Sequence, residues 1–580
     1  MRPNLVKWRE WGSEAFAEAE RDGKLVLLDI SAVWCHWCHV MDDTSYSDKN
    51  TSAIINMRYV PVRVDTDRMP DVNERYNMGG WPTTAILTPT GEVLLGATYM
   101  PPDKLLETLE EVDRFYQENK GRVMERAAQV REGKQAELLA YRQQRPDALP
   151  GDVAAEVLQE IEKEFEPVHG GFGTEPKFPM ADANDLLLVS YIDTGNKEYL
   201  EMSEKTLEGM SSYGMYDHVM GGFFRYSVTR DWTVPHFEKM MESNAALVVN
   251  YLNAFRLTGN EKWRTVALGT LKYIEEWLWD KEGYFCGSQD ADEEYYGLPL
   301  AERLSMTPPY VDHTLYTNLN MKAAYAFLSA WETLGEIRYR ERAESAVDYV
   351  LSKMKTPDGG LYHYLDEYPK RPGLLQDSSA AIKTLLYMYQ LTGEEKRLLD
   401  AMLLLDYLER THWDAEFEGF FDLPEDHEAV GALADRAKPM AENSEMSVSL
   451  KTLWVLTGTE RFLKMAEACL LPFAESFRQF SYMAANYALA SDFFIKPALE
   501  LHITGKSGNP DMTALADAAG KSFTPRRVIR LMDFGRDEAE IAGRGYKADG
   551  KAAAYLCKGF ICAAPIEDPE ELKKELLKAA

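Results

Sequence analysis

The chain has 580 residues, of which 45% are hydrophobic and 27% charged, the composition of a folded protein long enough for more than one hydrophobic core. Its 64 Lys and Arg residues against 94 Asp and Glu residues give a net charge of −30, which argues against partners that need a basic surface, such as nucleic acid or an anionic membrane. No apolar run approaches the roughly 18–20 residues of a membrane span.

The N-terminus leads from residues 1–4 directly into Trp8 and Trp11, without the apolar stretch of a signal peptide. We therefore expect a cytoplasmic protein. Six cysteines in 580 residues are too few for a disulfide scaffold. In a reducing compartment, the one CxxC pair is more typical of catalysis or metal binding than of structural cross-linking.

The first hundred residues alternate strand and helix signals. Residues 25–34 form an unbroken apolar stretch of strand length, typical of a strand buried on both faces. Cys35-His36-Trp37-Cys38 follows directly, and the segment after it, through Ile55, is predicted to be helical. Residues 59–64 predict a second buried strand and residues 84–95 a hairpin, followed by a helix from Pro102 to about Asn119. The order is a βαβ unit, a hairpin and a helix.

This segment resembles thioredoxin in specific positions. Trp34 precedes the CxxC pair, Asp29 lies six residues before Cys35, and Pro82 in an x-Pro-Thr segment lies 47 residues after it. The resemblance implies that Cys35 is an attacking thiolate at a helix N-terminus, where unpaired N–H groups and the helix dipole favour the anion. It also implies that Cys38 is the resolving thiol, that Asp29 handles the proton of Cys38, and that Pro82 is a cis-proline beside the bound substrate.

Other interpretations of the motif remain open. His36 and Trp37 replace the small turn residues of thioredoxin; an imidazolium at His36 would favour the thiolate further, or the side chain simply faces solvent. With His39 the string is also Cys-x-x-Cys-His, the attachment pattern of c-type haem, which we disfavour because haem attachment requires export. Zinc binding by Cys35, Cys38 and a histidine is disfavoured because no second ligand pair lies nearby. We expect no metal and no cofactor.

From about residue 150 to 495 long amphipathic helices prevail, and two short patterns recur. The first is a Thr-Gly type of turn, at Thr194-Gly195, Thr258-Gly259, Leu334-Gly335, Thr392-Gly393 and Thr457-Gly458. The second is Gly before an aromatic or apolar residue, at Gly171-Phe172, Gly222-Phe223, Gly283-Tyr284, Gly360-Leu361 and Gly419-Phe420. A glycine of the first type suits the left-handed conformation that ends a helix. Twelve alternating helices fit an (α/α)6 toroid closed by its two ends, with the two kinds of loop on opposite rims.

Polar and aromatic residues concentrate in the loops of the second pattern, where a funnel would open. The candidate pocket residues are Lys177, Arg225, Trp232, His236, Glu238, Lys239, Asp290 and Asp292. Carboxylates, a histidine and aromatic rings together suit acid–base chemistry on a sugar. The same residues would also serve to order the loops through hydrogen bonds and ring stacking.

The C-terminal residues 497–580 regain strand signals at 499–503, 527–531 and 552–556, with helices between them and a last helix from Pro569. This pattern predicts a small α/β lobe. Cys557 and Cys562 either form a disulfide, receive one from Cys35 and Cys38, or are plain buried thiols, and we favour the last of these.

Taken together, the motifs resemble one known family, the thioredoxin-domain proteins of the spermatogenesis-associated type. The matching strings begin at Trp11 and continue at 35–41, 79–82, 170–179, 221–226, 232–240, 290–292 and 557–562. The resemblance implies a thioredoxin domain fused to a toroid related to sugar epimerases and glycosidases, without a settled reaction. The sequence departs from the family pattern at Met241–Asn244 and in a shorter loop after Asp292.

We therefore predict a multidomain α/β plus all-α protein with a thioredoxin-like domain at 1–125, an (α/α)6 toroid at 150–496 and a small α/β lobe at 497–580. The leading hypothesis is a thiol–disulfide oxidoreductase whose partners are a protein thiol or disulfide and a thioredoxin-type reductant. The first alternative is a carbohydrate-active toroid with a saccharide ligand, in which the thioredoxin domain is a redox sensor or cap. The second alternative is a non-catalytic binding module. Neither nucleic acid nor a membrane is an expected partner.

Overall fold

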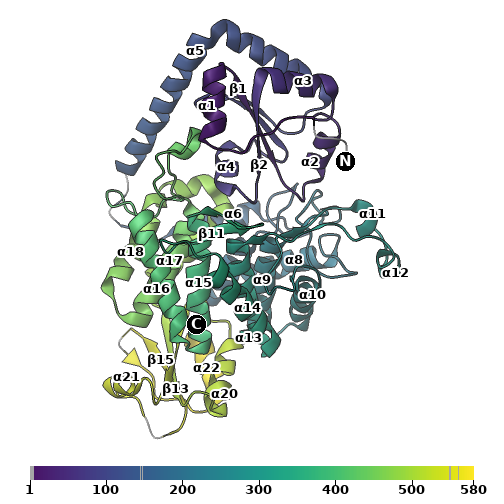
Figure 1. Ribbon diagram of the computed structural model, residues 1–580. Helices are drawn as coiled ribbons and strands as arrows, with labels where there is room; N and C mark the ends of the chain where they lie inside the picture. The colour runs from purple at the N-terminus through teal and green to yellow at the C-terminus, as the bar shows by residue number, and fades with distance from the viewer. Residues whose placement is uncertain (1–4, 144–145, 147, 548–549, 560, 580) are drawn as a thin grey trace. The chain divides into compact units, whose positions relative to one another are not determined.

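The computed structural model describes residues 5–143, 146, 148–547, 550–559 and 561–579, and these form two compact units. The first unit contains the N-terminal residues together with 422–437, and the second contains the remaining toroid residues and the C-terminal lobe. Figure 1 follows the chain through its elements from purple to yellow. Among the described residues, no helix combines the length and apolar character needed to cross a membrane.

The first unit is built on a four-stranded sheet. The strands are β1 (Leu25–Ser31), β2 (Tyr59–Asp65), β3 (Thr83–Leu87) and β4 (Val93–Ala97), in the order β2-β1-β3-β4. Strand β1 is parallel to β2 and antiparallel to β3, and β3 is antiparallel to β4. The helices are α1 (Ser13–Asp22), α2 (His36–Asp43), α3 (Lys49–Arg58), α4 (Pro70–Tyr76) and α5 (Pro102–Gln143). This is a thioredoxin-like domain, with the apolar stretch after residue 24 as its central buried strand.

Two helix predictions in this unit need correction. The helix after the CxxC motif is two helices, because the Asp48 carboxylate accepts the N–H groups of Asn50 and Thr51 and starts α3 afresh. The helix expected to stop near Asn119 continues to Gln143, although Asn119 itself has non-helical dihedral angles. The residues beyond Asn119 are rich in Arg, Glu, Ala and Gln, which favour helix.

A segment distant in sequence, residues 422–437, completes the first unit. Arg75 on α4 donates to the Asp422 carboxylate at 2.7 Å, and the Tyr76 hydroxyl accepts the N–H of Ala432 at 2.7 Å. Gly91 and Gly431 approach so closely that a Cβ on Gly91 would lie 2.3 Å from the Gly431 Cα. Asp422 therefore lies in the first unit, although the residues on either side of 422–437 belong to the second.

Six inner helices of the second unit form a closed ring. They are α7 (Ala181–Thr194), α9 (Met241–Thr258), α13 (Thr317–Leu334), α15 (Leu375–Thr392), α17 (Met440–Thr457) and α19 (Ala485–Ile495). Each packs on the next, and α19 packs back on α7. The outer helices are α6 (Val153–Glu164), α8 (Lys197–Ser212), α10 (Glu261–Trp277), α14 (Ile337–Lys353), α16 (Glu395–Thr411) and α18 (Glu460–Leu470). Since α6 packs on both α7 and α19, the two ends of the helical region close an (α/α)6 toroid.

The recurring glycines and aromatics explain this regularity. Gly195, Gly259, Gly335, Gly393 and Gly458 each end an inner helix at φ between 68° and 75°, the left-handed conformation that glycine adopts without a steric penalty. At the other rim, the backbone N–H and C=O of a phenylalanine pair with an asparagine side chain near the start of the next inner helix. The pairs are Phe223–Asn244, Phe285–Asn320 and Phe420–Asn443.

The loops of that rim carry short elements. These are β5 (Tyr226–Ser227), β6 (Pro235–His236), β7 (Lys239–Met240), β8 (Ser288–Gln289), β9 (Val311–Asp312), β10 (Leu315–Tyr316), β11 (Tyr362–Leu365), β12 (Pro369–Pro372), α11 (Glu293–Tyr296) and α12 (Leu300–Arg303). A 3-10 segment, η3 (Ser476–Ala484), directly precedes the last inner helix, α19.

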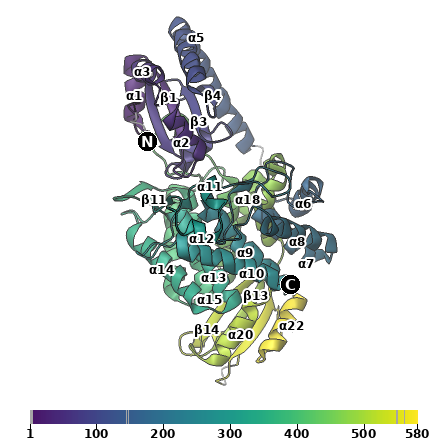
Figure 2. The same ribbon diagram turned by 90° about the vertical axis from the view of Figure 1, so that its right-hand side faces the viewer.

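The C-terminal lobe has a second four-stranded sheet. Its strands are β13 (Leu499–Gly505), β14 (Arg527–Asp533), β15 (Ala553–Lys558) and β16 (Ile561–Cys562), with α20 (Pro510–Gly520), α21 (Glu538–Gly543) and α22 (Pro569–Ala579). The order β14-β13-β15-β16 and the strand directions repeat those of the first unit. Ile529 donates its N–H to Gln390 near the end of α15, and Arg527 pairs with Glu332 near the end of α13. The lobe therefore covers the Thr-Gly rim of the ring (Figure 2).

Candidate functional site

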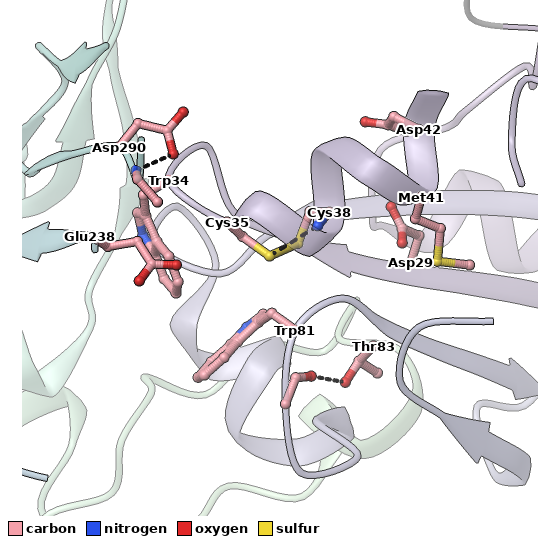
Figure 3. Close-up of a disulfide and its surroundings, with 12 residues drawn as sticks. Asp29, Trp34, Cys35, Cys38, Met41, Asp42, Trp81, Thr83, Glu238 and Asp290 are labelled. Atoms are coloured by element: carbon pink, nitrogen blue, oxygen red, sulfur yellow. Dashed lines mark hydrogen bonds between the residues drawn. A yellow bond between two sulfur atoms is a disulfide. The ribbon is translucent and has the colours of Figure 1, made fainter. Parts of the chain in front are cut away.

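The CxxC motif lies at the junction of β1 and α2. Cys35 is the N-cap residue of α2, and its sulfur accepts the N–H of Cys38 at 3.2 Å. Figure 3 shows the two cysteines joined in a disulfide, and both side chains are buried. Once the disulfide is reduced, the free amide groups and dipole of the helix start favour a thiolate on Cys35.

Two tryptophans bring the neighbouring loops together. Trp34 donates from its indole nitrogen to the Asp67 carboxylate at 2.6 Å, and its ring meets the Trp81 ring edge-on with centroids 5.6 Å apart. The peptide bond between Trp81 and Pro82 is cis. The residue before Cys35 therefore contacts the residue before Pro82, and Figure 3 shows Trp81 near the disulfide.

Asp29 lies on the central strand, buried, and both of its carboxylate oxygens have partners. The Tyr46 hydroxyl donates to one at 3.0 Å, and the Arg63 guanidinium donates to the other at 2.7 Å. Arg63 also pairs with Asp42 at the end of α2. Burial raises the pKa of Asp29, while the charge of Arg63 opposes that shift. His36, on the same helix as Cys38, is exposed.

Lys239, one of the candidate pocket residues of the toroid, is part of a closed ion cluster. Its ammonium group donates to Asp217 at 2.7 Å and to the Gly221 carbonyl at 2.9 Å, and it lies 4.2 Å from the centre of the Tyr273 ring. Arg303 donates to both oxygens of the Asp217 carboxylate at 3.0 and 2.8 Å. Burial lowers the pKa of Lys239 to about 8, against the opposing charge of Asp217.

Lys177 and Trp232 are likewise fully buried and order a loop. The Lys177 ammonium donates to Glu166 at 3.1 Å and to the Gly170 carbonyl at 2.6 Å, and the Trp232 indole donates to that same carbonyl at 3.3 Å. A Cβ on Gly171 would lie 2.5 Å from the Trp232 ring, so this glycine makes room for the indole.

The remaining candidates lie on the loops of the same rim. Nδ1 of His236 lies 2.6 Å from the Glu238 carboxylate, and the His236 ring stacks on Tyr226. Arg225 donates its backbone N–H to the carbonyl of His236. The Asp290 side chain accepts the N–H of the next residue, and the Asp292 side chain caps α11.

A cavity of about 620 Å³ lies inside the ring, lined by all six inner helices and by residues 522–529 of the lobe. The eight candidate residues named from the sequence are outside the lining formed by the described residues. Charged side chains of the inner helices line it instead, among them Asp182, Asp185, Glu242, Lys322, Lys383, Glu442 and Glu445. The use of the eight loop residues as a pocket stays a prediction.

The charges in this cavity are unevenly paired. Lys322 pairs with Glu242 at 2.5 Å, and Lys383 pairs with Glu445 at 3.0 Å. Burial raises the pKa values of Asp182 and Glu442. Asp185 accepts hydrogen bonds from Asn250 and Asn253, yet burial still raises its pKa to about 6. Carboxyl groups whose pKa lies near neutrality are suited to proton transfer.

The cavity residues are absent from the candidates named above, although the sequence contains a signal for them. An acidic residue of the cavity recurs in the first turn of three inner helices, as Asp182, Glu242 and Glu442. Each of these residues lies about one helix length before a Thr-Gly turn, so all of them fall on the rim opposite to those turns.

A second cluster of possible metal ligands was not predicted from the sequence; we expected no metal. Asp280, Cys286 and His313 place a carboxylate, a thiol and an imidazole within 4.8 Å of one another. His313 Nδ1 lies 3.0 Å from the Asp280 carboxylate and 3.5 Å from the Cys286 sulfur. Burial raises the pKa of Cys286 to about 12, so without a bound cation the thiol keeps its proton at neutral pH.

The interpretation of Cys557 and Cys562 as plain buried thiols is wrong. The two residues lie directly opposite each other on β15 and β16, with Cα atoms 4.0 Å apart, and they form a disulfide. The apolar strand around Cys557 suggested burial, but Cys562 is exposed, which the sequence pattern did not indicate.

Comparisons with known proteins agree with this architecture. A family model described as "Protein of unknown function, DUF255" matches residues 1–134. Spermatogenesis-associated protein 20 of Homo sapiens is 25% identical over 712 aligned residues, which cover 99% of this chain and 90% of that protein. A thioredoxin H-type of Fagopyrum esculentum is 33% identical over 85 residues, 15% of this chain and 69% of that protein.

Among solved structures, the cellobiose 2-epimerase of Spirochaeta thermophila DSM 6192 is 19% identical with a TM-score of 0.47, covering 59% of this chain and 94% of that one. The match over nearly the full length and the thioredoxin-like family model at the N-terminus show strong homology to spermatogenesis-associated protein 20.

Proposed function

We propose that the N-terminal domain catalyses thiol–disulfide exchange through Cys35 and Cys38. The observation that carries this proposal is the position of Cys35 as the N-cap of α2, within bonding distance of Cys38 one helical turn later. Exchange needs one sulfur that readily becomes a thiolate and a second sulfur that can displace it. The start of a helix supplies the first, and the three-residue spacing supplies the second.

The reaction proceeds in two displacements from the reduced pair. The Cys35 thiolate attacks one sulfur of a substrate disulfide, whose S–S bond breaks and whose other sulfur leaves as a thiolate and takes a proton. Cys38 then gives up its proton and attacks the Cys35 sulfur, which releases the second substrate thiolate. The substrate gains two electrons, and Cys35 and Cys38 become a disulfide that an external dithiol reduces again.

Asp29 is proposed as the group that takes the proton of Cys38. A carboxylate whose pKa is raised by burial is a better proton acceptor than an exposed aspartate. Arg63 and Tyr46 hold it in one orientation. Trp81 and Pro82 are proposed to form the substrate-facing side of the site.

A trapping experiment with Cys38→Ser tests the proposal. In this variant Cys35 can attack but no thiol can displace it, so incubation with oxidised glutathione is expected to leave a stable mixed disulfide. Mass spectrometry of the intact chain and of its peptides should place one glutathione on Cys35, removable by dithiothreitol. The double variant Cys35→Ser/Cys38→Ser is the matched control, and equal labelling of both variants at other cysteines would contradict the proposal.

A second candidate function rests on the cavity of the toroid. Its carboxyl groups with raised pKa values and its two paired lysines suit a small polar ligand, such as a saccharide, and acid–base chemistry on it. We propose this as the basis for a carbohydrate-active toroid. His236, Glu238, Asp290 and Asp292 stay proposed for the same chemistry on the loops.

The acid–base chemistry requires that Asp185 has a raised pKa in solution. The folded chain would hold this proton up to about pH 6, whereas an unfolded aspartate releases it near its ordinary value of 3.8. Its contribution to the free energy of unfolding therefore falls as pH rises from 4 to 6.

Relative to the wild type, Asp185→Asn is expected to gain about 1–2 kcal/mol of stability between pH 4 and pH 7. This is less than the full pKa shift would give, because Asp185 is only partly buried and solvent screens its charge. Urea unfolding at several pH values measures this difference. Asp193→Asn is the control, because hydrogen bonds from Arg526 and Lys496 lower the pKa of Asp193 despite its burial. The stability of Asp193→Asn relative to the wild type should therefore fall, not rise, as the pH increases. A pH-independent difference for Asp185→Asn would exclude the acid–base role.

A further inference from the structure

The C-terminal disulfide has two unlike sulfurs. Cys557 lies on β15 in the interior of the lobe with 1% of its surface exposed, whereas Cys562 on β16 is exposed. An attacking thiol from another molecule can therefore reach Cys562 but not Cys557. In thiol–disulfide exchange the attacked sulfur is the accessible one, and the other sulfur leaves as a thiolate. The asymmetry thus makes Cys557 the leaving group.

A polar group lies at the place where that thiolate would form. The Tyr546 hydroxyl lies 3.5 Å from the Cys557 sulfur and 3.5 Å from the Cys562 sulfur. On its other side it lies 2.7 Å from Nδ1 of His502, which is buried on the central strand β13. The ring of Tyr546 stacks on Tyr555 with centroids 3.9 Å apart. The hydroxyl is therefore fixed between an imidazole and both sulfurs.

His502 is a neutral partner of the Tyr546 hydroxyl. Burial, together with the positive charges of Arg544 and Arg530, lowers the pKa of His502 to about 3, and both guanidinium groups pair with Glu540. A disulfide sulfur is a weak acceptor, but a thiolate is a charged one, and hydrogen bonds to charged acceptors are roughly twice as strong as neutral ones. Tyr546 therefore stabilises the reduced pair more than the oxidised pair.

We propose that Cys557 and Cys562 are a second redox-active disulfide, reduced by a protein dithiol that attacks Cys562, with the Tyr546 hydroxyl stabilising the thiolate released on Cys557. The donor thiolate forms a mixed disulfide with Cys562 as the Cys557–Cys562 bond breaks. The second thiol of the donor then displaces Cys562. The donor leaves as a disulfide, and the two cysteines gain two electrons and the two protons of the donor. This inference does not rest on the chemistry of Cys35 and Cys38.

The test uses the full chain with Cys35→Ser and Cys38→Ser, so that the first pair contributes nothing. The protein is equilibrated in buffers of reduced and oxidised dithiothreitol, a dithiol probe, and its free thiols are counted by alkylation and mass spectrometry. The pair is expected to reduce and reoxidise reversibly in the folded chain. Tyr546→Phe should shift the equilibrium about 10- to 100-fold toward the disulfide, the effect expected for one hydrogen bond to a charged group.

Tyr555→Phe is the matched control. Its ring belongs to the same stack, but its hydroxyl accepts the N–H of Lys547 and has no contact with sulfur among the described residues, so its equilibrium should equal that of the parent. A disulfide that resists reduction until the lobe unfolds, or an unchanged equilibrium in Tyr546→Phe, would overturn the proposal.

The order of attack is tested separately in the same background. With Cys557→Ser the remaining Cys562 thiol should react with oxidised glutathione at least about 10-fold faster than the Cys557 thiol left in Cys562→Ser, because an exposed thiol is accessible to the reagent and a buried one is not. Equal rates would remove the assignment of Cys562 as the attacked sulfur. Circular dichroism of both variants shows that the lobe is folded in the comparison.

Discussion

Cys35→Ser is expected to lower the rate of disulfide reduction by the chain on the order of 10³-fold or more, as removal of a nucleophile does in other enzymes. A serine hydroxyl at the start of α2 gains the same dipole and amide groups as Cys35, but its proton is far too tightly held for it to become an anion at neutral pH. The measurement is reduction of an insulin disulfide or of a chromogenic aryl disulfide with dithiothreitol as electron source.

The matched control for this variant is Cys286→Ala. Cys286 is also a buried cysteine, but burial raises its pKa to about 12, so it takes no part in exchange at neutral pH and its loss should leave the rate unchanged. Any activity remaining in Cys35→Ser is expected to disappear when Cys557 and Cys562 are also replaced. Full activity in a chain lacking Cys35 would show that the N-terminal pair is not the reactive one.

The thioredoxin-like domain was largely predictable because its signals are local. The apolar stretch that becomes β1, the cysteine spacing and the hairpin before Pro102 each lie within a few residues. The toroid was predictable for a related reason, since left-handed glycines such as Gly259 and Gly393 mark the ends of five of the six inner helices. Helix limits were less predictable, because a cap such as Asp48 depends on a single side chain.

The candidate site was less predictable because its contacts join residues far apart in the chain. Arg303 reaches Asp217 across 86 residues, and nothing near either residue indicates the other. The cavity charges come from six helices, so no single segment displays them. Lys239 lies in a polar string that suggests a pocket, yet its ammonium group points at Asp217 and not into the cavity.

The cluster around Asp217 is expected to be costly to break. One carboxylate there balances two buried cations, the Lys239 ammonium and the Arg303 guanidinium. Removing one partner of a buried ion pair leaves the other charge uncompensated in a medium of low dielectric. Lys239 can relieve its part by releasing its proton, since burial already lowers its pKa to about 8. Arg303 cannot lose its charge in this way, because a guanidinium stays protonated in proteins.

Asp217→Ala is therefore expected to lower the free energy of unfolding by about 3–5 kcal/mol, the range for breaking a buried ion pair. Urea unfolding followed by far-ultraviolet circular dichroism, which is dominated by the helices of the toroid, measures it. Asp292→Ala, which removes only the cap of α11, should cost about 1 kcal/mol. Lys239→Met should cost less than Asp217→Ala, because Arg303 still neutralises Asp217 and the new side chain is apolar. If Asp217→Ala is the least stable of the three variants, the role of Lys239 is to hold the loops together. If Asp217→Ala is as stable as Asp292→Ala, Lys239 is again a candidate for binding a ligand.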